Sequence, residues 1–167
     1  MLNNVYKESL DKNNSTHEMD TLLLVTTMIE ERLAVNNADY IKLIKSDMFS
    51  SSECEQYKNE DNRFDVIVSN PPYIPTKDID ELSEEVRLHD PVLALDGDTD
   101  GLKFYKAITK QSVNYLKENG YLCYEIGYNQ AEDVRNIMEQ CGYSGIKVIK
   151  DLAGLDRVVI GRLNNIN

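Results

Sequence analysis

The residues best suited to chemistry in this chain are Asn70-Pro71-Pro72-Tyr73, which follow an apolar run at residues 64–69. Asn70 offers a side-chain carbonyl oxygen, and Pro71 offers a backbone carbonyl oxygen without a competing N–H. Two such acceptors match the two N–H bonds of a planar –NH2 group. Each proline also holds the residue before it in extended geometry, so the loop is stiff before substrate arrives. The tetrapeptide therefore predicts a site that grips an –NH2 group while its nitrogen is alkylated.

The chemistry of such a nitrogen explains why these residue types are useful. An amide or aromatic amino nitrogen is a poor nucleophile because its lone pair is delocalised, so a site must orient it. Tyr73 offers a flat face to a planar substrate group, and no strong base is needed, since the nitrogen becomes acidic only as the new bond forms. Taken alone, the tetrapeptide is equally typical of a proline-rich turn. The apolar strand before it favours the functional interpretation, because ligands bind at the carboxyl ends of strands in open α/β sheets.

Periodicity and turn residues predict the elements that position this loop. A capping box, Ser15 to Glu18, opens a helix predicted over residues 16–36. Residues 64–69 predict a central strand buried on both faces, because Asp65 is its one charged residue. A polar linker is expected at residues 50–63 and a long functional loop at residues 71–101. The remaining predicted elements are strands at 40–45, 121–126, 146–149 and 158–163, and helices at 102–118 and 130–141.

The last two predicted strands are joined by a segment too short for a helical crossover, so they should pair antiparallel. Together with the strand–helix alternation before them, they predict an α/β layered sheet with a carboxyl-terminal antiparallel hairpin. We expect a polar amino-terminal tail at residues 1–14, one domain at residues 15–163 and a short tail at residues 164–167. A chain of 167 residues is long enough for one buried core.

Composition excludes several functional classes. The formal net charge of −11 argues against direct nucleic acid binding, which needs clusters of Lys and Arg. The three widely spaced cysteines, Cys54, Cys123 and Cys141, suggest neither a disulfide framework nor a zinc site, and predict reduced thiols. No run is long enough to span a bilayer and no signal peptide is present, so we expect a cytoplasmic protein without a membrane partner or a metal.

Four ordered segments make the chain resemble the HemK-type protein-(glutamine-N5) methyltransferases, which modify the Gly-Gly-Gln motif of peptide chain release factors. Residues 64–74 (FDVIVSNPPYI) match the signature loop of that family. Residues 89–105 (HDPVLALDGDTDGLKFY), 125–130 (EIGYNQ) and 150–159 (KDLAGLDRVV) resemble three further family segments. The resemblance extends over residues 31–163 and implies a Rossmann-like, S-adenosylmethionine-dependent methyltransferase sheet.

The resemblance also implies roles for individual residues. Asn70, as the catalytic residue, and the Pro71 carbonyl would hold the glutamine amide, with Pro72 and Tyr73 lining its pocket. Asp47 would accept a hydrogen bond from the adenine of S-adenosylmethionine, and Asn70 would also lie against this cofactor. Taken without the resemblance, Asp47 is an ordinary loop or capping acid.

The chain departs from this family at its amino end. The first glycine is Gly97, so no glycine-rich loop precedes the tetrapeptide to let the backbone approach the cofactor. The family strand order is 3-2-1-4-5-7-6, and this chain corresponds to a carboxyl-terminal, truncated portion that lacks the first strands. Removing them exposes strand edges, which predicts rearrangement or self-association.

Three functions follow. The first is N5-methylation of the release factor glutamine, in which this chain alone is expected to be inactive or weak. The second is a DNA or RNA amino-group methyltransferase that uses the same loop. The third is a non-catalytic remnant or binding domain, which keeps the glutamine-gripping loop without a cofactor site.

Overall fold

The computed structural model describes residues 41–164, which belong to two compact units, Met1–Glu53 and Cys54–Asn167. The predicted tail at residues 1–14 and helix at residues 16–36 lie outside the described residues. In the first unit, residues 41–45 form no strand, so the strand predicted at residues 40–45 is wrong over this stretch. A strand is stable only when its backbone groups are paired, and within the described part of the chain no strand pairs with residues 41–45.

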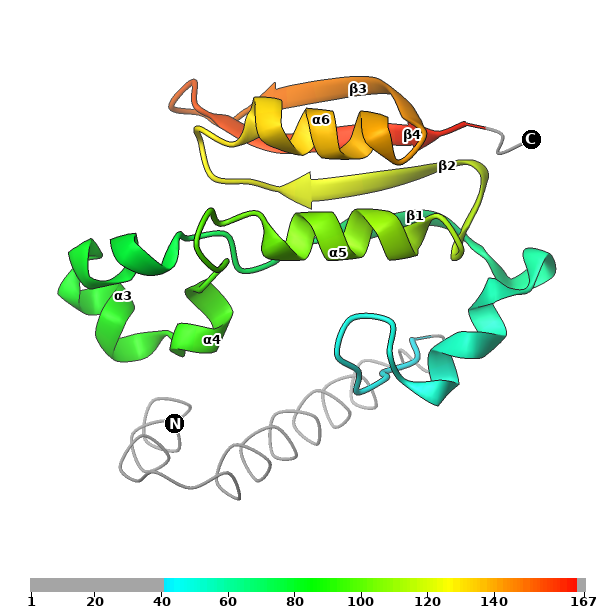
Figure 1. The fold of residues 1–167 in the computed structure, drawn as a ribbon, viewed down its shortest axis with the longest axis horizontal. Coiled ribbons are helices and arrows are strands. Elements are labelled where there is room, and N and C mark those ends of the chain that lie inside the picture. The colour runs from blue at the N-terminus through cyan, green and yellow to red at the C-terminus, as the bar shows by residue number, and fades with distance from the viewer. Residues whose placement is uncertain (1–40, 165–167) are drawn as a thin grey trace. The chain divides into compact units, whose positions relative to one another are not determined.

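The second unit is built on a four-stranded sheet (Figure 1). Its strands are β1 (Phe64–Ser69), β2 (Leu116–Glu125), β3 (Tyr143–Lys150) and β4 (Asp156–Leu163). Their spatial order is β1-β2-β4-β3, with β1 parallel to β2 and the other two pairs antiparallel. This is the order of the last four strands expected from the resemblance. The predicted α/β fold and its carboxyl-terminal hairpin are therefore confirmed.

Two helices, α5 (Lys103–Ser112) and α6 (Ala131–Gln140), cover the face of the sheet seen in Figure 1. The buried positions of α5 recur at helical spacing, and α6 buries Val134 and Met138. Under α5, the rings of Tyr105 and Tyr124 meet edge to face with centroids 5.1 Å apart. This contact packs α5 against β2.

Tyrosine hydroxyl groups in this core have hydrogen-bond partners on α5. Thr109 and Tyr124 share a hydrogen bond of 2.8 Å, and Ser112 and Tyr143 share one of 2.7 Å. Burial raises the pKa of Tyr124, and it raises the pKa of Tyr143 to about 12. The fold therefore favours the neutral form of both hydroxyl groups, and their hydrogen bonds offset the cost of burying these polar atoms.

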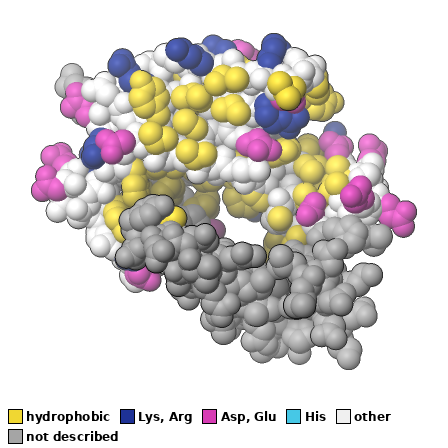
Figure 2. All heavy atoms as spheres, turned by 180° about the vertical axis from the view of Figure 1, so that it is seen from behind, with side chains coloured by type: hydrophobic (Ala, Val, Ile, Leu, Met, Phe, Trp, Pro, Cys, Tyr) yellow, Lys and Arg dark blue, Asp and Glu magenta, His cyan; other side chains and the backbone are white. Residues whose placement is uncertain are grey.

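The opposite face of the sheet is open, which corrects the prediction that β1 is a central strand buried on both faces. Val66 and Val68 are 49% and 75% exposed, and Ile67 is the buried residue of β1. Among residues 41–164, β1 pairs with β2 alone, so it forms an edge of the sheet. Figure 2 shows hydrophobic side chains gathered over this face, where Tyr121 of β2 and Ile149 of β3 are also exposed.

Other predicted elements differ in extent. The helix predicted at residues 102–118 ends at Ser112, because Leu116 is buried in β2 and pairs with Phe64. Two segments predicted to be irregular contain short helices: η1 (Ser52–Lys58), η2 (Glu60–Asn62), η3 (Thr76–Glu81), α3 (Glu84–His89) and α4 (Val92–Leu95). None of the helices within residues 41–164 has the length and apolar character needed to span a membrane.

Candidate functional site

The tetrapeptide Asn70–Tyr73 lies at the carboxyl end of β1, next to the end of β2. Ser69, the last residue of β1, pairs in parallel with Tyr124, and β2 ends one residue later at Glu125. Because parallel strands end at the same edge of a sheet, the loops that follow β1 and β2 lie close together. This is the edge where the sequence placed a ligand site.

The four residues of the tetrapeptide differ in exposure in a way that suits binding. Asn70 is exposed, Pro71 is buried, and Pro72 and Tyr73 are half-buried. No residue in the described range 41–164 hydrogen-bonds to the Asn70 side chain. Its carbonyl oxygen is thus free to accept a hydrogen bond from outside the described residues, and the Pro71 ring beside it is buried.

The backbone after the tetrapeptide is held by the segment that precedes α5. The N–H of Ile74 donates to the carbonyl of Leu95 (2.9 Å), and the N–H of Gly97 donates to the carbonyl of Ile74 (2.8 Å). The Thr76 N–H donates to the Asp98 carbonyl at 3.1 Å. Residues 74–76 therefore cannot move without the segment at residues 95–98.

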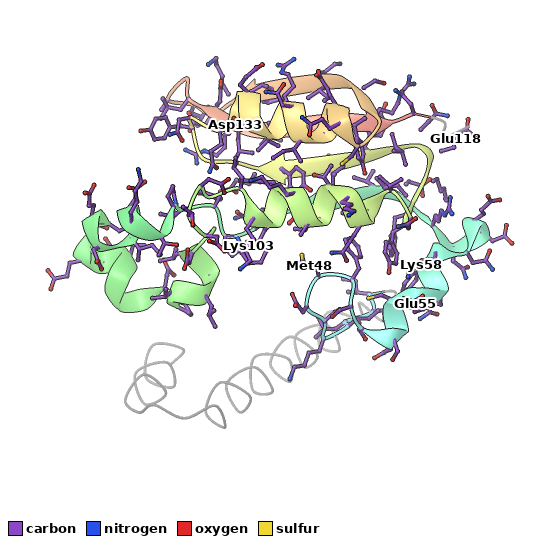
Figure 3. The ribbon with its side chains drawn as sticks, viewed as in Figure 1. Met48, Glu55, Lys58, Lys103, Glu118 and Asp133 are labelled. Atoms are coloured by element: carbon purple, nitrogen blue, oxygen red, sulfur yellow. The ribbon has the colours of Figure 1, made fainter. Side chains whose placement is uncertain are left out.

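Asp98 of that segment, and Asp100 just after it, are in turn linked to α5 by exposed ion pairs. Lys103, labelled in Figure 3, lies 3.1 Å from a carboxylate oxygen of Asp98, and Lys106 lies 2.6 Å from Asp100. The adjacent lysines and backbone N–H groups lower the pKa of both aspartates; the N–H of Thr99 has the largest effect on Asp98, and Lys106 has the largest effect on Asp100. Each pair is solvent-exposed and contributes little stability alone.

A buried glutamine that the sequence analysis did not single out connects the loops of this site. Gln130 is 6% exposed, and its side-chain Nε2 donates to the Tyr73 carbonyl at 2.9 Å and to the Gly101 carbonyl at 3.3 Å. Its Oε1 accepts a hydrogen bond from the N–H of Gly127 at 3.0 Å. The only signal for it in the sequence is its place at the end of the segment EIGYNQ, which gives no information about its contacts.

Two further side chains border Tyr73. Tyr105 donates its hydroxyl hydrogen to the Glu125 carbonyl at 3.0 Å, and burial raises its pKa. The guanidinium of Arg157 donates to Asp151 from Nε (3.3 Å) and from Nη2 (3.2 Å), and its Nη1 donates to the Ile126 carbonyl at 3.3 Å. The hydrogen bond that Arg157 donates to the Asp151 carboxylate is the main cause that raises the pKa of Arg157. A cation is therefore fixed at the edge of the site.

The described residues do not fit the whole of S-adenosylmethionine. A cofactor of this kind needs glycines that leave open space for its methionine part. The sequence has no glycine before Gly97, and at Gly97, Gly101 and Gly127 a Cβ would meet the protein's own Tyr73 or Gln130, so these three glycines serve close packing within the chain. Asp47, the predicted adenine contact, is exposed in a turn of the first unit, where its carbonyl accepts from the N–H of Ser50 at 3.0 Å.

Comparison with known proteins gives a consistent set of relatives. The family model described as Eco57I restriction-modification methylase matches residues 3–136. The release factor glutamine methyltransferase of Clostridium botulinum is 42% identical over 136 residues, which are 81% of this chain and 46% of that protein. The release factor glutamine methyltransferase of Fusobacterium nucleatum is 39% identical over 132 residues, which are 79% of this chain and 36% of that protein.

A crystal structure of a release-factor-specific protein-(glutamine-N5) methyltransferase from Alicyclobacillus acidocaldarius also matches. It is 25% identical, with a TM-score of 0.42 and coverage of 66% of this chain and 55% of that one. The chain spans less than half the length of the two curated relatives above.

Proposed function

This chain belongs to the methylase family that the Eco57I model describes and to the HemK-type protein-(glutamine-N5) methyltransferases, and we propose that it supplies the glutamine-binding part of such an enzyme. Its substrate would be the glutamine of the Gly-Gly-Gln motif in a peptide chain release factor, methylated at N5. The observation that carries the proposal is the exposed Asn70 at the end of β1, next to the buried Pro71.

In this proposal, the tetrapeptide binds and orients the substrate amide. The Asn70 side-chain oxygen accepts one N–H of the glutamine amide, and the Pro71 carbonyl accepts the other. Because both N–H bonds then point into the loop, the orientation of the amide plane, and with it that of the nitrogen lone pair, is fixed. Pro72 keeps Pro71 in extended geometry, and Tyr73 packs against the planar amide, so the grip is formed before substrate binds.

Methyl transfer in this family uses S-adenosylmethionine, and we propose Asp47 and Asn70 as its contacts within this chain. Because the described residues do not fit the whole cofactor, we expect S-adenosylhomocysteine to bind this chain far more weakly than the peptide substrate. Calorimetric titration of the 167-residue chain with S-adenosylhomocysteine measures this directly. Micromolar binding would show that the chain forms a complete cofactor site, whereas a folded sample that binds only peptide acts as a binding domain.

The test of the proposed function is peptide binding by an Asn70 variant. We expect wild-type protein to bind a Gly-Gly-Gln peptide and Asn70→Ala to weaken binding by about tenfold or more, since one charge-neutral hydrogen bond and its geometry are lost. Asn129→Ala, at an exposed position after β2, is the matched control. A Gly-Gly-Glu peptide should bind as poorly as the Asn70 variant binds Gly-Gly-Gln. Equal binding by wild type and Asn70→Ala would overturn the assignment of Asn70.

The match to the Eco57I methylase model supports a second candidate, a nucleic acid amino-group methyltransferase. The net charge of −11 opposes it, because phosphate contacts require cationic side chains. A single-stranded oligonucleotide containing adenine separates the two candidates. Displacement of the Gly-Gly-Gln peptide by this oligonucleotide at low micromolar concentration would favour the second.

We also propose that the open edge of β1 allows self-association. The exposed Val66 and Val68 of that strand and Tyr121 of β2 form an apolar surface on which another strand or copy would bury area. We also propose a cytoplasmic location, which fits the proposed release factor partner and the absence of a disulfide at Cys54, Cys123 and Cys141 within residues 41–164.

A further inference from the structure

The side chain of Gln130 is a buried polar group whose hydrogen-bonding pattern is matched by three separate loops. Its two N–H bonds meet two backbone carbonyl oxygens, those of Tyr73 and Gly101, and its oxygen meets the backbone N–H of Gly127. A primary amide is the neutral side chain with two donors and an acceptor in this arrangement. A carboxylate or a thioether of the same size would leave the two carbonyls without donors.

The hydrogen bond from Gln130 to Tyr73 means that both ends of the tetrapeptide are held. At its start, Ser69 is fixed by pairing with Tyr124 of β2. At its end, the Tyr73 carbonyl is fixed by Gln130, which precedes α6 only five residues after β2 ends. Both ends of the loop are thus tied to one segment of the chain. Between them, Pro71 and Pro72 have fixed φ angles, so few torsions remain that could move Asn70.

Two glycines make room for this arrangement. A Cβ on Gly127 would lie 2.8 Å from Oε1 of Gln130, and a Cβ on Gly101 would lie 2.7 Å from its Nε2. The helix start also holds Gln130 from its backbone, since its N–H donates to the Gly127 carbonyl and its carbonyl accepts from the Val134 N–H, both at 3.0 Å. Backbone and side chain are therefore held together at one point, which is what a rigid anchor requires.

We propose that Gln130 is a positioning residue, which fixes the Tyr73 carbonyl and thereby aims the Asn70 side chain at the substrate amide. The inference rests on the proposed function for its consequence, which is the strength of glutamine binding. The structural part of the inference, that Gln130 holds the loop at residues 70–76 in one conformation, does not depend on that function. Gln130 does not touch the substrate; it acts through Tyr73.

The test uses two variants of the full chain and one control. Gln130→Met keeps the size of the side chain and removes its hydrogen bonds, and Gln130→Glu keeps its shape but replaces the donors with an ionisable carboxyl. Gln140→Met, at the exposed end of α6, is the matched control. For each protein, amide hydrogen exchange is measured at Ile74 and Gly97 and across β2 and β4, together with the affinity for a Gly-Gly-Gln peptide.

We expect both Gln130 variants to raise exchange at Ile74 and Gly97 by about tenfold or more, while the strand amides keep their protection. Their peptide affinity should fall by a similar factor, and Gln140→Met should behave as wild type. Lowering the pH from about 8 to about 5 should restore affinity in Gln130→Glu, because the protonated carboxyl regains an O–H donor. Gln130→Met has no such group, so its loss of affinity should be the same at both pH values. A general loss of packing would not produce this difference between the two variants.

Several results would overturn the proposal. One is slow exchange at Ile74 and Gly97 in both variants, with unchanged affinity. Another is a loss in Gln130→Glu that does not recover at the lower pH. If neither variant folds, the wild-type protein still decides: Ile74 and Gly97 amides that exchange as fast as exposed amides would show that Gln130 does not hold the loop at residues 70–76. If the wild type fails to bind peptide while the Gln130 variants show the expected faster exchange, the proposed function is rejected and the role of Gln130 in holding the loop remains.

Discussion

A side chain on Gly101 would collide with the backbone carbonyl oxygen of Tyr73. Gly101 has a φ of +71°, and an added Cβ would also lie 2.7 Å from Nε2 of Gln130. We therefore expect Gly101→Ala to destabilise the fold by the left-handed strain of ~1–2 kcal/mol plus a steric cost of ~1–3 kcal/mol. Chemical denaturation of both proteins measures the difference.

Gly154 provides the matched control for this prediction. Its φ is +81°, similar to that of Gly101, but an added Cβ would meet no atom within 4 Å. Gly154→Ala should therefore show the backbone strain alone. Equal losses in the two variants would mean that the approach of Tyr73 to Gly101 has no energetic consequence, and would weaken the case for a tightly packed loop.

The sequence predicts the secondary structure well where periodicity and turn residues agree. The strand at residues 64–69 has the predicted bounds, and the predicted helix at residues 130–141 differs from α6 by one residue at each end. The burial of β1 was predicted wrongly, since an apolar run does not reveal whether a strand has neighbours on both sides. The predicted helix also extended past Ser112, because Leu116 fits an apolar position of a helix as well as its place in β2.

The site shows the same division. Asn70 and Pro71 are found at a strand end because their residue types suit a ligand, and that can be read locally. Gln130 lies 57 residues from Tyr73 in sequence, and a glutamine before a helix is ordinary by composition. Its importance arises from long-range contacts alone, so no local pattern indicates it. The roles of Asn70–Tyr73 and Asp47 stay predictions until binding is measured.

Buried tyrosines predict a loss of stability in alkali. An unfolded tyrosine ionises near pH 10, whereas burial raises the pKa of Tyr143 in the fold to about 12. Above about pH 10 the unfolded chain releases a proton that the folded chain keeps, so stability falls as pH rises, by about 1.4 kcal/mol per pH unit for this group. In Tyr143→Phe the slope between those pH values should be shallower by that amount.

Urea denaturation at several alkaline pH values tests this. The Ser112 hydroxyl still donates to the Thr109 carbonyl at 2.9 Å, so Tyr143→Phe leaves no buried donor unsatisfied. Tyr128→Phe, at a side chain that is 62% exposed, should keep the wild-type slope. An unchanged slope in Tyr143→Phe would show that this hydroxyl ionises in the fold as readily as in the unfolded chain.

The open edge of β1 and the apolar face of the sheet beside it predict association that depends on concentration. Val68 of β1 is 75% exposed on the apolar face of the sheet, and we expect Val68→Lys to remove association by placing a charge there. Leu93→Lys is the matched control, because Leu93 is 74% exposed but lies on α4. Sedimentation velocity over a range of concentrations should show a monomer for Val68→Lys and wild-type behaviour for Leu93→Lys. A wild-type protein that stays monomeric throughout would exclude both the edge of β1 and this face as contacts between copies.

Acid should weaken the hairpin that carries Arg157. The pKa of Asp151 is lowered, first by the N–H of Leu155 and then by Arg157 and the N–H of Ala153. A carboxyl with a lowered folded pKa stabilises the fold above its unfolded value near 3.9, and this contribution is lost as the pH falls below it. Asp151→Asn should therefore be less stable than wild type at neutral pH, and the difference in free energy of unfolding should narrow as the pH drops below about 4.

The control is Asp80→Asn, at an exposed carboxyl, which should have the same stability as wild type throughout this series of denaturation measurements. A gap for Asp151→Asn that stays constant with pH would mean that the shape of the side chain, rather than its charge, holds the hairpin beside Tyr73.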